Sequence, residues 1–289
     1  MLSQADQASE SGDYQEALKL FHQVLQQNPS VTEAYIGLGD VYLTQQDYAK
    51  AEPVFARAAR LEPDSFDAQY GHGVALQMLD RLVDAVRAFH RALTIDPASV
   101  DANLQLGTVY LQQRDPRNAI NFLARAVELD PTSGPAHLNY AAALQEVGSP
   151  KEAIEQYRAA AELMEPSAEL LFNLVTLLAE EKRYREAVNA AQTLVRLDPT
   201  ATTYERLGWA YFRLGEYQNS EMAYQEAVSI DPDYYKALNG VGVNALNQWL
   251  RSDRTSQEAF LKAQAAFRQS LRVNKSQSKV IQLMMKYGL

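Results

Sequence analysis

The sequence contains no cysteine and only four histidines among its 289 residues. Without cysteine the chain has no disulfide bond, no thiol nucleophile and no thiolate ligand for a metal ion. The four histidines stand in different parts of the chain, and no two have the spacing typical of metal ligands: His22, His72, His90 and His137. We therefore expect no metal site, and we interpret His72 and His137 as core histidines with satisfied ring nitrogens.

The chain also lacks the motifs of common catalytic sites. It has no glycine-rich phosphate-binding loop, no nucleophile elbow and no motif of paired catalytic carboxylates. Many acidic residues stand directly before a proline, as Glu62, Asp96 and Asp130 do, and we interpret these as markers of helix ends. The sequence therefore predicts no catalytic residue, no bound cofactor and no metal ligand, and we expect that the protein is not an enzyme.

Basic residues are scarce, because 27 Lys and Arg stand against 36 Asp and Glu and give a formal net charge of −9. Nucleic-acid binding depends on Lys and Arg side chains that neutralise phosphates, so we expect no nucleic-acid partner. No apolar run approaches the length of a membrane span, and the first residues are not a basic segment followed by an apolar one. We expect no membrane insertion of this segment.

What the sequence does contain is an internal repeat with a period of about 34 residues. One alanine recurs at the same place in successive repeats: Ala17, Ala51, Ala85, Ala119, Ala153 and Ala187. One proline recurs in the same way, with slightly adjusted spacing in the last three: Pro29, Pro63, Pro97, Pro131, Pro166, Pro199 and Pro232. A fixed period of this length indicates an array of identical supersecondary units, each of which buries its apolar face only against its neighbours.

The repeat from Thr32 to Asp64 shows what one unit is. Its apolar and small residues have helical spacing in two sets, one in residues 34–42 and one in residues 51–58. A short polar break separates the two sets at residues 46–48, and Glu62 with Pro63 ends the second, because a residue before proline is forced out of the helical region. Each unit is therefore predicted to be a helical hairpin.

The residues that recur in this unit resemble the tetratricopeptide repeat pattern position for position: Tyr35, Leu38, Gly39, Tyr42, Ala51, Phe55, Ala58 and Pro63. The resemblance covers nearly the whole chain and implies an all-α fold, a right-handed α-solenoid of antiparallel helix pairs. We expect a single array at residues 1–275, followed by a C-terminal capping helix at 276–289. The eight predicted repeats are residues 1–31, 32–65, 66–99, 100–133, 134–167, 168–200, 201–234 and 235–275.

Two regions at the end of the chain depart from the pattern. Extra residues around Asn247 to Arg254 predict a lengthened first helix and a wider turn in repeat 8, with a helix-capping signature from Thr255 to Glu258. The last segment places apolar residues on one helical face: Val280, Leu283, Met284 and Tyr287. We interpret it as the capping helix, and the alternative is a helix that binds a partner.

The resemblance further implies that the first helices of the repeats line a concave groove. The predicted partner-binding groove has an apolar row at the fifth repeat position, continued by two aromatic residues of repeat 7: Ile36, Tyr70, Leu104, Leu138, Phe172, Trp209 and Phe212. An acidic row at the second position lies beside it: Glu33, Asp67, Asp101 and Glu169. Val243 and Leu246 extend the apolar character, whereas Arg213 and Lys236 change the charge. The alternative is that fifth-position side chains only pack between neighbouring first helices.

These rows predict a noncatalytic scaffold or adaptor that binds a peptide or helical segment of a protein partner, apolar and with basic residues. Similar arrays that bind chaperone tails hold a carboxylate with Lys, Asn and Arg side chains from three successive repeats. Asn173 and Arg206 are the only comparable pair here, so no chaperone clamp is predicted. Two alternatives stay open: a recognition region of a larger enzyme or membrane-associated assembly, and a self-assembling scaffold.

The first repeat is incomplete, because its register extrapolates to a point slightly before Met1. We therefore expect that the sequence is a segment of a longer protein. The composition leaves the compartment open. We expect a soluble segment in the cytoplasm, or in the periplasm or tethered to a membrane if a preceding part carries a signal or an anchor.

Overall fold

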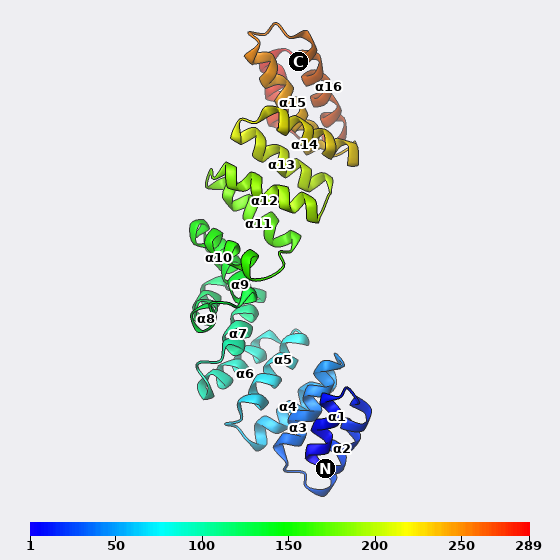
Figure 1. The fold of residues 1–289 in the computed structure, drawn as a ribbon, viewed down its shortest axis with the longest axis vertical. Coiled ribbons are helices and arrows are strands. Elements are labelled where there is room, and N and C mark those ends of the chain that lie inside the picture. The colour runs from blue at the N-terminus through cyan, green and yellow to red at the C-terminus, as the bar shows by residue number, and fades with distance from the viewer. The chain divides into compact units, whose positions relative to one another are not determined.

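The computed structural model describes residues 1–289 and contains seventeen α-helices and no strand (Figure 1). The predicted all-α solenoid class is confirmed. The helices are α1 (Leu2–Glu10), α2 (Tyr14–Gln27), α3 (Thr32–Thr44), α4 (Tyr48–Leu61), α5 (Phe66–Met78), α6 (Leu82–Ile95), α7 (Val100–Gln112), α8 (Pro116–Leu129), α9 (Gly134–Glu146), α10 (Pro150–Leu163), α11 (Ala168–Glu180), α12 (Tyr184–Leu197), α13 (Ala201–Leu214), α14 (Tyr217–Ile230), α15 (Tyr235–Arg251), α16 (Gln257–Val273) and α17 (Ser278–Tyr287).

Each helix pair falls within one predicted repeat, and the turn inside the pair is short. In repeat 2 the turn runs from Gln45 to Asp47, and Gln46 adopts a left-handed conformation with φ of 59°. The Asp47 side chain accepts a hydrogen bond from the backbone N–H of Lys50 and so caps the start of α4. Aspartate therefore starts the second helix by satisfying one of the N–H groups that have no partner within the helix.

Small residues set the distance between the two helices of a pair. A Cβ atom added at Gly39 would lie 2.5 Å from the Phe55 ring, and one added at Gly107 would lie 2.7 Å from Leu123 Cδ2. Both distances are too short for real atoms, so the large residue of the second helix fills the space that glycine leaves on the first. Interiors are packed this closely throughout, and the pairing of small with large residues determines how the helices meet.

In repeats 2 to 5, a hydrogen bond from the fourth residue of the repeat ties the first helix to the turn before it. The acceptor is the carbonyl oxygen of the recurring proline, which a helix end leaves without a backbone partner. The donors and acceptors in repeats 2 to 5 are Tyr35 with Pro29 (3.3 Å), Gln69 with Pro63 (3.0 Å), Asn103 with Pro97 (3.3 Å) and His137 with Pro131 (3.0 Å). The donor side chain therefore differs from repeat to repeat, whereas the acceptor is the proline carbonyl each time.

The chain divides into two compact units, residues 1–163 and residues 164–289. Within the first unit, α1, α3, α5, α7 and α9 contact one another in succession, and within the second, α11, α13 and α15 do the same. First helices therefore form a layer of their own in each unit. We call the surface of that layer the first-helix face. The assignment of residues 1–275 to one array and of residues 276–289 to a cap stays a prediction.

Repeat 8 has the lengthened first helix and the wider turn that the sequence predicts. Helix α15 has 17 residues, against 13 in α3, and α16 also has 17 residues. The turn is closed by Trp249, whose indole N–H donates to the carbonyl of Arg254 at 3.1 Å. The capping residue is Ser256, which accepts from the N–H of Ala259, rather than Thr255, because the wider turn places the helix start one residue later.

Helix α17 packs against repeat 8. Val280 is buried in a cluster with Leu246 and Phe267, and Leu283, Met284 and Tyr287 contact the same cluster. None of the helices combines the length and apolar character needed to cross a bilayer.

Candidate binding surface

In residues 1–163, the predicted apolar row consists of side chains that are all half-buried. Ile36 packs against the cluster of Ala51, Phe55 and Ala75, and Leu104 packs against a corresponding cluster in the next repeats. Leu138 is half-buried as well. These side chains support the helix packing with one side and keep the other side exposed on the first-helix face. Packing between neighbouring helices, the alternative to a binding role, therefore accounts for one side of each of these side chains but not for the exposed side.

Tyr70 is the aromatic member of this row in residues 1–163. Its ring stacks on Phe66, with ring centroids 5.6 Å apart, and lies tilted against Phe89 at 5.8 Å. Burial raises the pKa of the Tyr70 hydroxyl, and the charge of Asp101 adds to the shift, while a hydrogen bond with Gln105 opposes it. Tyr70 thus joins α5 to α7, and its removal affects stability as well as the surface.

The predicted acidic row is fully exposed: Glu33, Asp67, Asp101 and Glu169. Three residues of the acidic row lie in residues 1–163. The structure adds a fourth carboxylate beside them, that of Asp40 at the ninth position of repeat 2. Burial of its carboxyl group raises the pKa of Asp40 to about 6, and repulsion from Asp67 adds to the shift. Two carboxylates from adjacent repeats therefore face the same part of the first-helix face, which attracts cationic groups.

We expect Asp40→Asn to stabilise the protein at about pH 7 but not at about pH 4. Because the pKa of Asp40 is higher in the folded chain than its usual value of 3.8, the folded state binds more protons between these values. Stability therefore falls as pH rises through this window, and the full penalty remains above it. Asp40 as a whole residue is exposed, although neighbouring atoms crowd its carboxyl group, so solvent screening should limit the gain to about 1 kcal/mol. Urea unfolding at both pH values measures it, with Glu33→Gln as the control, and an equal gain at both pH values would contradict the assignment.

In residues 164–289, Phe172 is half-buried, and the guanidinium carbon of Arg206 lies 4.8 Å from the centre of its ring. This distance is that of a cation–π contact between α11 and α13. The Arg206 Nε atom is buried without a hydrogen-bond partner. The predicted groove residue Phe172 is thus partly covered by a side chain of the next repeat.

A pocket of about 410 Å³ opens between α13 and α15 on the first-helix face. Five of its lining residues were singled out from the sequence: the predicted Trp209 and Phe212, and the flanking Arg213, Lys236 and Val243. Four others were missed: Glu205, Tyr224, Asn239 and Gly240. Glu205 carries a signal that the sequence offered, because it replaces an apolar residue at the fifth position. We call this cavity the repeat 7/8 pocket.

Glu205 is the carboxylate of the repeat 7/8 pocket, and only 14% of its side chain is exposed. Its nearest cation is Arg206, with Nε 4.0 Å from a carboxylate oxygen. Burial raises the pKa of Glu205, and the charges of Arg206 and Lys236 oppose the shift. The carboxylate is therefore poorly hydrated and lacks a short ion pair, so a hydrogen-bond donor from a ligand would stabilise it.

The aromatic wall of the repeat 7/8 pocket is held by neighbouring side chains. Trp209 meets the ring of Tyr184 edge to face at 6.2 Å, and Phe212 meets Tyr217 in the same way at 5.5 Å. The guanidinium of Arg213 lies 5.3 Å from the centre of the Trp209 ring and 4.8 Å from that of Tyr184, whose hydroxyl accepts a hydrogen bond from it. These contacts fix the wall before any ligand arrives, which lowers the entropy lost on binding.

The histidines occupy structural positions. Nδ1 of His137 lies 2.6 Å from Gln156 Oε1, and its Nε2 lies 3.0 Å from the Pro131 carbonyl, so both ring nitrogens have partners as expected. His72 differs from the expectation. Its Nε2 lies 3.4 Å from Glu52 Oε1, but its Nδ1 is buried without a partner.

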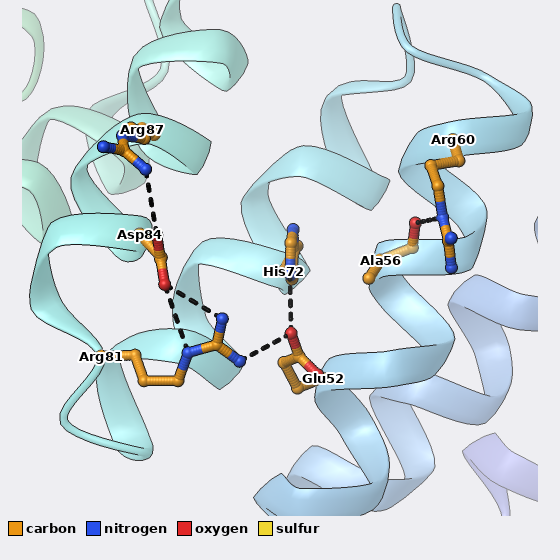
Figure 2. Close-up of polar contacts among 7 residues, drawn as sticks. All are labelled: Glu52, Ala56, Arg60, His72, Arg81, Asp84 and Arg87. Carbon is orange, nitrogen blue, oxygen red and sulfur yellow. Dashed lines mark hydrogen bonds and ion pairs between the residues drawn. The ribbon is translucent and has the colours of Figure 1, made fainter.

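Figure 2 shows that Glu52 also accepts a hydrogen bond from Arg81 at 3.0 Å. Arg81 in turn donates a hydrogen bond to Asp84 on α6. Burial lowers the pKa of His72, and its hydrogen bond with Glu52 opposes the shift. The cluster joins α4 to α6 through the ion pair of Glu52 with Arg81, and His72 links α5 to Glu52. No group of three or more His, Asp or Glu side chains is placed to hold a metal ion.

Comparison with known families identifies the repeats. A family model described as tetratricopeptide repeat matches residues 8–76, 76–138 and 110–157, and a second model with the same description matches residues 172–235. No curated protein sequence matches the chain.

Several solved structures resemble the chain. MamA is 25% identical, with a TM-score of 0.53 over 56% of this chain and 94% of its own. The pilF protein of Pseudomonas aeruginosa is 20% identical, with a TM-score of 0.61 over 68% of this chain and 90% of its own. YrrB, described as a tetratricopeptide repeat protein with an unusual peptide-binding site, is 21% identical, with a TM-score of 0.50 over 77% of this chain and 97% of its own.

The matched models and the neighbouring folds indicate a protein-interaction scaffold. Proteins built from these repeats bind protein or peptide partners and are generally noncatalytic.

Proposed function

Because the chain belongs to the tetratricopeptide repeat family, we propose that it is a noncatalytic adaptor whose first-helix face binds an extended or helical segment of a partner protein. The partner segment lies across successive first helices. In residues 1–163 it presents apolar side chains to the apolar row and basic side chains to the acidic row.

One observation carries this proposal: half-buried apolar side chains recur at one position of α3, α5, α7 and α9, beside exposed carboxylates on α3, α5 and α7. A contiguous apolar strip exposed to water favours association, and a charged border beside it is typical of an interaction surface. The carboxylates have a second role. Exposed charges at the border of an interface act mainly on the rate of encounter and on partner selection.

The test starts with peptides selected from a random displayed library on the intact chain. We expect selected peptides to combine large apolar residues with Lys or Arg. Asp67→Asn with Asp101→Asn should weaken their binding by about 3- to 10-fold at low salt and flatten its salt dependence. The control is Asp64→Asn with Glu162→Gln, which removes the same charge from exposed turn and helix-end positions.

A second pair of variants tests the apolar row. Leu138→Ser should weaken binding by about 10-fold or more if this side chain is an anchor, whereas Val83→Ser, which changes an exposed residue on α6, should leave binding unchanged. Both proteins should melt close to the parent, because Leu138 is only half-buried and Val83 is 62% exposed. If neither the acidic nor the apolar variant affects any selected peptide, the first-helix face of residues 1–163 is not the binding surface.

A further inference from the structure

The floor of the repeat 7/8 pocket carries a hydroxyl group that the fold does not use. Tyr224 is only 4% exposed and lines the pocket. Its ring lies against Gly208 and Gly240, and a Cβ atom at Gly240 would overlap it. The missing side chain of Gly240 therefore makes room for the tyrosine ring between α13 and α15.

Other repeats show that this hydroxyl is not needed for packing. Phenylalanine fills the same position in repeats 1, 2, 3 and 8 and is fully buried there: Phe21, Phe55, Phe89 and Phe267. Repeat 5 also has a tyrosine, but the hydroxyl of Tyr157 donates to Gln145 Oε1 at 3.0 Å. The hydroxyl of Tyr224 has no hydrogen-bond partner within the chain. Because it is not among the side-chain atoms that are both sealed from solvent and unpaired, this hydroxyl is accessible from the pocket, where a ligand can pair with it.

Two complementary polar groups thus face the interior of the pocket. Burial raises the pKa of Tyr224, so its hydroxyl stays protonated and can donate a hydrogen bond. The enclosed carboxylate of Glu205 can accept one. Trp209, Phe212 and Val243 supply apolar walls. A ligand that both accepts and donates at the tip of a flat apolar body matches this arrangement, and a phenol group is such a ligand.

The rim of the pocket carries the opposite charge from the acidic row of residues 1–163. Arg213 and Lys236 are exposed and have no ion pair with a carboxylate. Together with Arg206, they outnumber the single carboxylate of Glu205. The field at the mouth of the pocket is therefore positive, and it favours acidic groups beside the part of the ligand that enters.

We propose that the repeat 7/8 pocket binds a tyrosine side chain of a partner protein whose neighbouring residues are acidic. The ring lies between Trp209, Phe212 and Val243, the phenol O–H donates to Glu205, and the Tyr224 hydroxyl donates to the phenol oxygen. Carboxylates on either side of the tyrosine pair with Arg213 and Lys236. The proposal rests on the adaptor function proposed above and adds a second binding preference, at residues 164–289.

The test uses short fluorescent peptides with a central tyrosine between glutamates, titrated against the intact chain and followed by anisotropy. The comparison peptides replace the tyrosine with phenylalanine, or the glutamates with lysines. We expect the tyrosine peptide to bind about 10-fold more tightly than the phenylalanine peptide, because the latter leaves both buried polar groups unpaired. The lysine peptide should show no measurable binding. Equal binding of the tyrosine and phenylalanine peptides would overturn the proposed recognition.

Matched variants assign the effect to the pocket. Tyr224→Phe should reduce the preference for the tyrosine peptide over the phenylalanine peptide by about 5-fold, while Tyr157→Phe should leave it unchanged. Arg213→Gln with Lys236→Gln should weaken binding of the acidic peptide and reduce the salt dependence of that binding. The control, Arg268→Gln with Arg272→Gln, removes the same charge from exposed positions of α16 and should have little effect. Since phenylalanine is tolerated at the position of Tyr224 in four other repeats, the variant is expected to fold.

The outcomes separate this inference from the adaptor function. The pocket assignment is wrong if no acidic peptide binds, or if Tyr224→Phe leaves the preference for tyrosine unchanged. The adaptor function still stands in that case if library peptides bind and the substitutions of Asp67 and Asp101 weaken their binding. If neither library peptides nor the acidic peptides bind, both fail.

Discussion

Gly107→Leu should lower the free energy of unfolding by about 1–3 kcal/mol. A side chain at this position has no room, because even a Cβ atom would come within 2.7 Å of Leu123 Cδ2 and 3.3 Å of the Ala119 carbonyl. The contact with Leu123 is the more severe one, and the nearby Ala119 carbonyl on α8 limits how far the new side chain can move away from it. Urea unfolding monitored by circular dichroism measures the change, and a midpoint equal to that of the parent would show that α7 and α8 are paired differently.

A compensating substitution distinguishes crowding from a general intolerance of leucine. Leu123→Ala alone should destabilise the protein by about 2–5 kcal/mol through the cavity that it leaves. Combined with Gly107→Leu, it removes the atoms that the new side chain meets, so the double variant should be more stable than the sum of the two effects predicts. Strict additivity would mean that the two residues do not contact each other.

Val280→Asp should release α17 from repeat 8. Val280 is 6% exposed in a cluster with Ala263 and Phe267, and burying an unpaired carboxylate there costs more than the docking of one short helix contributes. Loss of the helix should lower the free energy of unfolding by about 2 kcal/mol or more. It should also shift Trp249 fluorescence to the red, because the Tyr287 ring lies 6.3 Å from the indole.

The control lies on the same helix. Met285 is 79% exposed, so Met285→Asp introduces the same charge without burying it and should leave both stability and fluorescence unchanged. If Val280→Asp behaves like this control, α17 does not cover the end of repeat 8, and the alternative that it binds a partner gains support.

The repeat period carried most of the fold information in the sequence. A residue that recurs at a fixed interval, such as Ala119 or Pro131, occupies the same structural position in each repeat. The structure predicted for one unit therefore predicts the others. The same reasoning located the lengthened α15, because Gly242 and Ala263 fall out of register. The longer α16 was not foreseen, since additional turns of a helix leave its own register intact.

The contacts that depend on departures from the repeat could not be predicted in the same way. Tyr224 fits the pattern as an aromatic residue, and only the structure shows that its hydroxyl faces a pocket while that of Tyr157 meets Gln145. Glu205 interrupts the apolar row, but its enclosure depends on residues of α15. Trp209 and Phe212 were identified because they continue the apolar character of the groove positions into repeat 7. A sequence shows which residue type occupies each repeat position, but it does not show whether a polar side chain there has a hydrogen-bond partner.

The central claim is that partner segments lie on first helices, and photo-crosslinking tests it most directly. A library-selected peptide carrying a photoreactive benzophenone group is bound to the intact chain and irradiated, and mass spectrometry locates the attached residues. We expect attachment on α5, α7 and α9, or on α13 and α15 for the acidic tyrosine peptide. Attachment confined to the second helices, such as α4, α6 and α14, or to α17 would contradict it.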